Sequence, residues 1–265
     1  RDVRAMLKVG VAIGAVLIPV QIFMGDLHGL NTKQYQPAKV AAMEGLWETQ
    51  AGAPLVLFAI PDETARTNHM AVEIPGLASF VLTHEWDGVL KGLNEFVAED
   101  GTILHPPVAP VFWSFRVMVG TGMAMLLISW ASVWFMWRGR ARHQGRIAGH
   151  WFAVEALPKP ILWVLVPMAF SGWVATLAGW YTTEIGRQPW LVQGVMTTEM
   201  AVADVPAPLV LGTLITYLAI YAALLFAYVG VIAYLARKAA RGEDGSAIDM
   251  THSGKAGVIA LSPAE

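Results

Sequence analysis

Four long apolar stretches constrain the fold of this chain more than any other feature of its sequence. They lie at about residues 8–25, 111–137, 160–180 and 207–235. Each is close to or above the ~20 residues that an α-helix needs to cross the hydrocarbon core of a bilayer. The composition agrees, because only 14% of the residues are charged, whereas soluble domains carry about 25%. We therefore expect an all-α fold, an integral membrane helical bundle with four transmembrane helices.

Basic residues predict how these helices are oriented. Arg and Lys cluster at residues 1–8, 138–146 and 237–241, and the positive-inside bias places such ends in the cytoplasm. The predicted order is a first transmembrane helix at 1–25, a long outer-side loop at 26–110, a second transmembrane helix at 111–137, a cytoplasmic loop at 138–159, a third transmembrane helix at 160–184, an outer-side loop at 185–206, a fourth transmembrane helix at 207–236 and a cytoplasmic tail at 237–265.

The stretch WYTTEIGRQPW, residues 180–190, ends the third predicted helix and concentrates polar chemistry at a membrane boundary. On a continuing helix, Trp180 and Glu184 lie one turn apart and Arg187 lies about one turn further. A buried carboxylate and guanidinium at this depth are costly unless each has a partner, which favours a functional site. The alternative is an interfacial aromatic belt with a snorkelling Arg. The predicted topology places Arg116 on the same outer side, under the same loop.

Several classes of site are excluded or weakened. The chain has no cysteine, so it cannot form a disulfide, a thiolate nucleophile or an iron–sulfur cluster from its own residues. No basic stripe suggests a nucleic-acid partner. None of the seven histidines lies inside a predicted crossing, so the chain alone would not hold a bis-His haem. Met118 is the remaining soft ligand, although a lone Met in a membrane helix usually serves packing.

Three separated motifs resemble subunit I of the cytochrome bd-type quinol oxidases. WYTTEIGRQPW contains its GRQPW signature, PAKVAAMEGLWETQ followed by FAIPD resembles its quinol-binding loop, and PPVAPVFWSFRVMVG resembles the helix with its haem-ligating Met. The motifs occur in the family's order, and the resemblance covers nearly all of residues 10–236. Between its IPGLASFVL piece and the FRVMVG helix the outer-side loop is short, which resembles the short-loop, often cyanide-insensitive, branch. Because the family subunit has further helices before this region, the resemblance implies a C-terminal half. The initial Arg, followed at once by a helix, likewise suggests a fragment of a longer polypeptide.

The resemblance implies a haem role for five side chains. Met118 matches an axial ligand of the low-spin haem b iron, whose second ligand is a His of the missing half. Arg116 matches an arginine beside that haem, where a guanidinium can pair with a propionate. Glu184 matches the ligand of the high-spin haem b iron. Arg187 matches an arginine near the haem propionates, and Trp180 a tryptophan near the high-spin haem b and haem d.

Lys39 and Glu44 match the loop residues implicated in quinol oxidation. A carboxylate near a lysine can accept a proton from a quinol or orient its hydroxyl. The two residues are five positions apart, so they are not ideal neighbours on a regular helix. A solvated loop face is the alternative. Asp26 and Trp47 lie in the matched segments without an assigned role.

The resemblance therefore implies a terminal respiratory oxidase that oxidises ubiquinol or menaquinol at the outer side and reduces dioxygen to water, contributing to the proton gradient. The expected cofactors are low-spin haem b, high-spin haem b, and haem d or a replacement haem b. Expected partners are the N-terminal half of subunit I, a second large membrane subunit, small single-helix subunits and the bilayer of a bacterial inner membrane, with the long loop periplasmic. The alternatives are a haem-free transporter or structural subunit with a buried Glu184–Arg187 pair, and a paralogue that keeps the fold without haem d.

Overall fold

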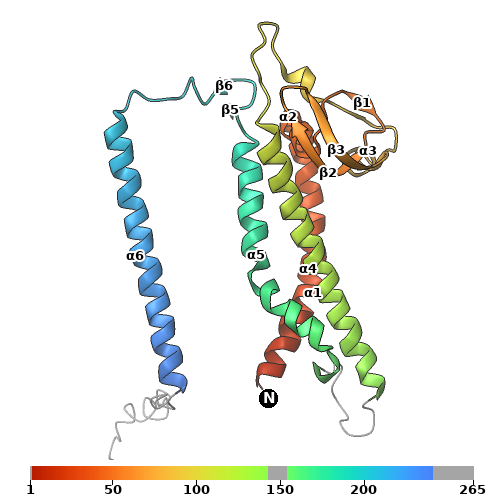
Figure 1. Cartoon of the computed structure of the whole chain (residues 1–265), viewed down its shortest axis with the longest axis vertical. Helices are drawn as coiled ribbons and strands as arrows, with labels where there is room; N and C mark the ends of the chain where they lie inside the picture. The colour runs from red at the N-terminus through yellow and green to blue at the C-terminus, as the bar shows by residue number, and fades with distance from the viewer. Residues whose placement is uncertain (1, 143–153, 241–265) are drawn as a thin grey trace, which may run out of the picture. The chain divides into compact units, whose positions relative to one another are not determined.

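The computed structural model describes residues 2–142 and 154–240 of the chain. Four long helices dominate it (Figure 1). They are α1 (Asp2–Tyr35), α4 (Val108–Arg142), α5 (Lys159–Ile185) and α6 (Ala207–Ala240). By length and composition, each could cross a membrane. The predicted helical membrane fold with four crossings is therefore confirmed.

The helices are longer than the apolar stretches that predicted them. Helix α1 continues to Tyr35, well past residue 25, and α4 begins before residue 111 and ends after 137. Hydropathy marks the residues that suit lipid, whereas a helix ends where its backbone is interrupted, and Pro37 is the first proline after the crossing. As a result His28 lies within α1, although the sequence placed every histidine outside a crossing.

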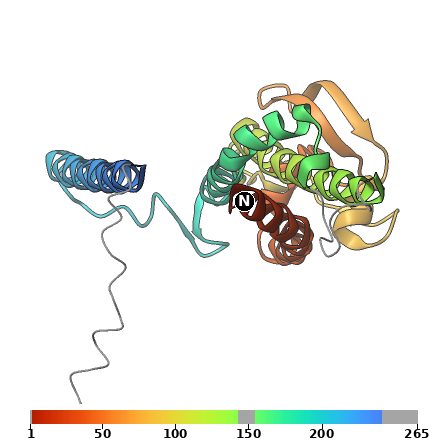
Figure 2. The same cartoon turned by 90° about the horizontal axis from the view of Figure 1, so that it is seen from below.

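The chain divides into two compact units, residues 1–202 and 203–265. In the first unit α4 packs against both α1 and α5, and the three helices gather side by side when viewed from below (Figure 2). At one end, Val11 of α1, Met136 of α4 and Leu157 before α5 form one buried cluster. There Arg4 also pairs with Glu155 at 2.7 Å. The second unit contains α6.

The opposite end of these helices carries the long loop. Thr182 of α5 donates a hydrogen bond to Ser114 of α4 at 2.9 Å, so the end of α5 and the start of α4 lie level with each other. Helix α2 (Pro37–Glu44) packs over this end, where its residues share a core with Trp47, Leu93 and the first turn of α4. The long loop therefore sits at the end of the first unit where α5 finishes and α4 begins.

The outer segments also contain short β-structure that the apolar pattern did not predict. Within the described residues there are three two-stranded antiparallel sheets and one further α-helix. The pairs are β1 (Gln50–Ala51) with β4 (Val89–Leu90), β2 (Leu55–Asp62) with β3 (Thr67–Ile74), and β5 (Trp190–Val192) with β6 (Met196–Thr197); α3 is Leu77–Thr83 and a 3₁₀ helix, η1, is Leu93–Phe96. The long loop is therefore folded into short helices and paired strands.

Some predicted segments lie partly outside the described residues. The expected cytoplasmic loop at 138–159 includes residues 143–153, and the expected tail at 237–265 includes residues 241–265. Residue 1 of the first basic cluster is also outside. The short 3₁₀ helix η2 (Val154–Ala156) immediately precedes α5.

Candidate functional site

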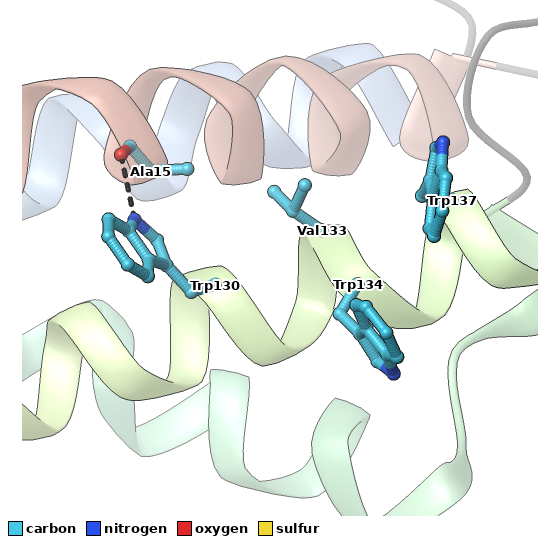
Figure 3. A pocket seen from close by; sticks show the side chains of 5 residues that line it. All are labelled: Ala15, Trp130, Val133, Trp134 and Trp137. Atoms are coloured by element: carbon cyan, nitrogen blue, oxygen red, sulfur yellow. Dashed lines mark hydrogen bonds between the residues drawn. The ribbon is translucent and has the colours of Figure 1, made fainter.

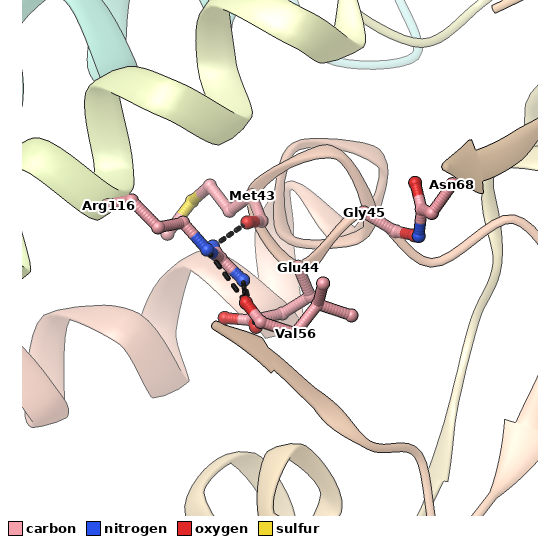
Figure 4. A network of polar contacts seen from close by, with 6 residues as sticks. All are labelled: Met43, Glu44, Gly45, Val56, Asn68 and Arg116. Atoms are coloured by element: carbon pink, nitrogen blue, oxygen red, sulfur yellow. Dashed lines mark hydrogen bonds and ion pairs between the residues drawn. The ribbon is translucent and has the colours of Figure 1, made fainter. Parts of the chain in front are cut away.

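A buried guanidinium joins the outer loop to α4 (Figure 4). Arg116 Nε donates a hydrogen bond to the carbonyl of Val56 at 2.9 Å, and Nη1 donates to the carbonyl of Met43. Arg116 Nη2 forms an ion pair with Glu44 Oε2 at 3.2 Å, and the two side chains are only 13% and 6% exposed. One side chain therefore holds α2 and β2 against α4.

The turn after α2 is shaped to bring Glu44 to this position. Gly45 has a left-handed φ of 67°, which few other residues adopt without strain. A Cβ at Gly45 would lie 3.1 Å from the Phe112 ring. Asn68 of β3 donates a hydrogen bond to the Gly45 carbonyl at 2.8 Å, and Trp47 donates to Asn68 at 3.0 Å. Backbone conformation and hydrogen bonds together fix the end of α2.

The environment of Glu44 favours its protonated form. Burial raises the pKa of Glu44 above its ordinary value of 4.5, and the charge and hydrogen bond of Arg116 oppose this rise without cancelling it. Desolvation disfavours the ionised form of a carboxyl group, whereas a nearby cation favours it. Glu44 is thus a carboxyl group that can hold and release a proton at a pH above its usual range.

Lys39 occupies the other side of α2 and faces the end of α5. It is 7% exposed, and a Cβ added to Gly186 would lie 3.0 Å from Lys39 Cγ and 3.2 Å from its Cε. Burial lowers the pKa of Lys39, Arg187 lowers it further, and Glu184 acts in the opposite direction. Lys39 and Glu44 therefore have different neighbours, as their five-residue spacing implied. Since both are buried, the alternative of a solvated loop face is wrong.

Glu184, in the last turn of α5, forms an ion pair at 3.7 Å with Arg187, two residues past the helix end. Their side chains are 47% and 45% exposed, and Trp180, one turn earlier, is also exposed. The expectation that this pair is buried is wrong for the described chain, because no described element covers this face of α5. Exposed ion pairs contribute little to stability. Its face remains accessible to another group.

Met118 is a residue of α4, and its half-buried side chain points toward α5. A Cβ added to Gly179 would lie 2.8 Å from Met118 Sδ, so the sulfur occupies space that only a glycine leaves open. Within residues 2–142 and 154–240 there is no group of three or more His, Asp or Glu side chains that could hold a metal ion.

Glu63 is a positioning residue that sequence reasoning missed. It follows β2, and its Oε1 accepts hydrogen bonds from the backbone N–H groups of Val108 at 2.8 Å and Ala109 at 3.4 Å. A carboxylate at a helix N-terminus satisfies free N–H groups and complements the helix dipole. Glu63 is 45 residues from Val108, and no local sequence signal reveals the contact. The hydrogen bond from Arg116 to the Val56 carbonyl could not be predicted either, because the two residues are 60 positions apart.

A hollow between α1 and α4 lies near their other end (Figure 3). Ala15, Val133 and three tryptophans line it, namely Trp130, Trp134 and Trp137. Trp130 Nε1 donates a hydrogen bond to the Ala15 carbonyl at 3.1 Å. The lining has no titratable group, so the hollow offers no acid–base or ligand chemistry.

Comparison with known proteins decides the family. The family model for cytochrome bd terminal oxidase subunit I matches residues 1–240. The chain belongs to this family. Three curated relatives are similar to it. Subunit 1 of the cytochrome bd-II ubiquinol oxidase of Escherichia coli is 29% identical over 88% of this chain and 54% of the relative. Subunit 1 of the cytochrome bd ubiquinol oxidase of Bacillus subtilis is 32% identical over 68% of this chain and 36% of the relative.

The third relative is the putative cytochrome bd menaquinol oxidase subunit I of Bacillus subtilis, which is 29% identical over 91% of this chain and 50% of the relative. A solved structure, the bd oxidase from Geobacillus thermodenitrificans, superposes with a TM-score of 0.66 and 29% identity over 84% of this chain and 47% of that chain. The chain spans about half the length of the curated relatives it matches. Its relatives and its four apolar helices indicate a bacterial inner-membrane protein.

Proposed function

We propose that this cytochrome bd subunit I chain works within a terminal oxidase that takes electrons from membrane quinol and delivers them through haems to dioxygen, which becomes water. The observation that carries the proposal is the buried junction of Glu44 and Arg116. It joins a proton-holding carboxyl group in the loop to the helix turn that also bears Met118. The printed names of the relatives, which include ubiquinol and menaquinol oxidases, support quinol as the electron donor.

The residues present fit haem. Met118 offers a thioether whose sulfur packs against Gly179, and Glu184 offers a carboxylate on an accessible face with Trp180 one turn away. We assign Met118 to a low-spin haem b iron and Glu184 to a high-spin haem b iron, with any His ligand supplied from outside this chain. Bound haems, including haem d or a further haem b, supply one-electron transfer and dioxygen reduction.

The loop residues act on the quinol side. Glu44 Oε2 lies against Arg116, so we assign proton acceptance from a quinol hydroxyl to its other oxygen, Oε1, after the carboxyl group has first released the proton that it holds. Arg116 limits the cost of the negative charge that Glu44 acquires when the proton leaves. Lys39, a buried cation on the opposite side of α2, orients a quinol oxygen or the loop around it. Arg187, at the end of α5, carries a guanidinium that can pair with haem propionates.

The site faces the outer side of the membrane in this proposal, and the protons for dioxygen reduction enter from the cytoplasmic side, which builds the gradient. The proposed partners are the N-terminal half of subunit I, a second large membrane subunit and small single-helix subunits. No observation favours a haem-free transporter or structural subunit, since the Glu184–Arg187 pair is exposed. Retention of the fold without haem d is distinguished by extracting the pigments.

The test is a reduced-minus-oxidised spectrum of the full complex. Met118→Leu removes the sulfur and should abolish or shift the low-spin haem b signal. Met123→Leu is the matched control, because Met123 is exposed on the same helix and should leave the spectrum unchanged. An unaltered low-spin signal in Met118→Leu would defeat the assignment.

The carboxylate is tested in the same way. Glu184→Ala should lose the high-spin haem b and the oxidase activity, whereas Glu199→Ala, on the exposed outer segment after β6, should retain both. Full activity and pigment in Glu184→Ala would contradict its role. A colourless wild-type complex would contradict the proposed function itself.

A further inference from the structure

The β2–β3 hairpin of the outer loop exposes an unusual amount of apolar surface. Phe58 of β2 pairs with Val72 of β3, and both side chains are exposed. The exposed hydrophobic residues of the hairpin are Leu57, Phe58, Ile60, Met70, Val72 and Ile74, with fractions from 40% to 75%. Single exposed apolar residues are ordinary, but a contiguous group on one element marks an interaction surface.

Three contacts fix the hairpin along the first turns of α4. Beside its turn, Glu63 accepts a hydrogen bond from Val108, the first residue of α4. Further back along β2, the rings of Phe58 and Trp113 meet edge to face with centroids 5.1 Å apart. At the start of the strand, Val56 accepts a hydrogen bond from Arg116. Figure 1 accordingly draws β2 and β3 beside the upper turns of α4.

These contacts give the depth of the hairpin relative to the helix. Val108 and Arg116 are eight positions apart, which is about 12 Å at ~1.5 Å per residue. The strand therefore descends beside α4 from the level of Val108 toward that of Arg116, two levels about 12 Å apart along the helix axis.

The length of α4 relates this depth to the bilayer. The apolar span Val108–Gly139 has 32 residues and is about 48 Å long, against ~30 Å for the hydrocarbon core and ~40–45 Å with the headgroups. A centred span then extends roughly 9 Å beyond the hydrocarbon at each end. Arg116 lies near the outer hydrocarbon boundary, and the hairpin beside it lies at headgroup level. The exposed Trp113 agrees, because tryptophan is enriched at this level.

We propose that the β2–β3 hairpin lies in the outer interfacial layer of the bilayer, with its exposed apolar side chains against lipid. Its surface continues that of α4, since the exposed Phe58 touches Trp113, which is itself exposed on a helix of spanning length. The polar residues Asp62, Glu63 and Arg66 gather at the turn, which is the end furthest from the hydrocarbon. Glu73 lies opposite Val56, at the end of the hairpin nearest the outer hydrocarbon boundary. The proposal concerns lipid contact and does not depend on the proposed oxidase activity.

Single-cysteine labelling tests it, because this chain has no cysteine of its own. Ile60→Cys and Met70→Cys would each carry an environment-sensitive fluorophore in the full complex, reconstituted into phosphatidylcholine vesicles. Ala65→Cys, on the exposed turn of the same hairpin, is the matched control, and the unsubstituted complex gives the background. Nitroxide-bearing phosphatidylcholine should quench the dyes at 60 and 70 several-fold more than the dye at 65. Iodide in the buffer should show the reverse order.

Two outcomes would overturn the proposal. If iodide quenches positions 60 and 70 as strongly as 65 and the lipid nitroxide does not, the hairpin lies in water. If neither quencher reaches them, a protein surface covers the hairpin instead. Val72→Cys, exposed on β3, replaces either variant that fails to assemble and is subject to the same criteria.

Discussion

Arg116 and Glu44 are both buried, and each lowers the free-energy cost of burying the other's charge. The guanidinium also donates to two backbone carbonyls, those of Val56 and Met43, so its charge is dispersed over three acceptors. Removing one partner of a buried ion pair typically costs about 3–5 kcal/mol, because the remaining charge is left uncompensated. Glu44 has an alternative to this penalty, since a carboxyl group can become neutral by binding a proton.

The first prediction concerns this proton. The pKa of Glu44 is raised in the folded state, so the folded chain binds a proton more readily than the unfolded chain. The resulting stabilisation is complete below the unfolded pKa of about 4.5 and is lost as pH rises through the folded pKa. The melting temperature of the complex should therefore fall with rising pH above about 5, and Glu44→Gln should reduce this slope.

Glu99→Gln is the control for this measurement, because Glu99 is an exposed carboxylate in the same loop. It should melt with the pH dependence of the wild type. An identical slope in Glu44→Gln and the wild type between pH 5 and 8 would show that Glu44 does not hold a proton in the folded state.

At the scale of residues, the sequence did not predict the neighbours of the candidate side chains. Arg116 was expected beside a haem propionate, and the structure gives it Glu44 as an ion-pair partner, 72 positions earlier in the chain. No spacing rule reaches across such a distance. The separation of Lys39 from Glu44 was predictable, because five positions on a helix place two side chains on different sides.

Among the elements of the first unit, α4 organises the outer end. It contacts α2 through Arg116, the β2–β3 hairpin through the Glu63 hydrogen bond, and α5 through the Ser114–Thr182 hydrogen bond. Its first residues therefore determine how the loop sits on the helices.

The second prediction removes the Glu63 cap. Glu63→Ala leaves the N–H groups of Val108 and Ala109 without their acceptor, which should cost about 1 kcal/mol in loop stability. Glu63→Gln keeps an acceptor oxygen but loses the charge that complements the helix dipole, so it should cost about 0.3–1 kcal/mol. Denaturant-dependent proteolysis of the loop in the assembled complex measures the order of stability, which should fall from the wild type to Glu63→Gln and then to Glu63→Ala. If Glu63→Ala behaves as Glu99→Ala does, the cap contributes nothing.

The apolar pattern predicted the long helices because each contains an uninterrupted apolar stretch that is long enough to cross a membrane. It did not predict β2 and β3, since their apolar residues do not alternate cleanly: Leu57 and Phe58 are consecutive and both exposed. Two register shifts in the β2–β3 pairing produce this irregularity. Nor did it predict the extension of α1 to Tyr35, because polar residues such as those after residue 25 are compatible with a helix in water.

For the molecule as a whole, the third prediction concerns the orientation in the membrane. The positive-inside bias places the turn of the hairpin outside and the end of α6 inside. A membrane-impermeant maleimide applied to intact cells should label Arg66→Cys, an exposed turn residue, and should not label Arg237→Cys near the end of α6. Both should react after the cells are opened. Labelling of position 237 in intact cells would invert the topology.

The contacts of Arg116 place few demands on the side chains of an outer loop exchanged from a relative. Two of its three partners in the loop are main-chain carbonyls, which every amino acid provides. A grafted loop could carry different side chains at positions 43 and 56 and still seat on α4, provided that its backbone followed the same path. The one side chain that the contacts of Arg116 still require is an acid at position 44.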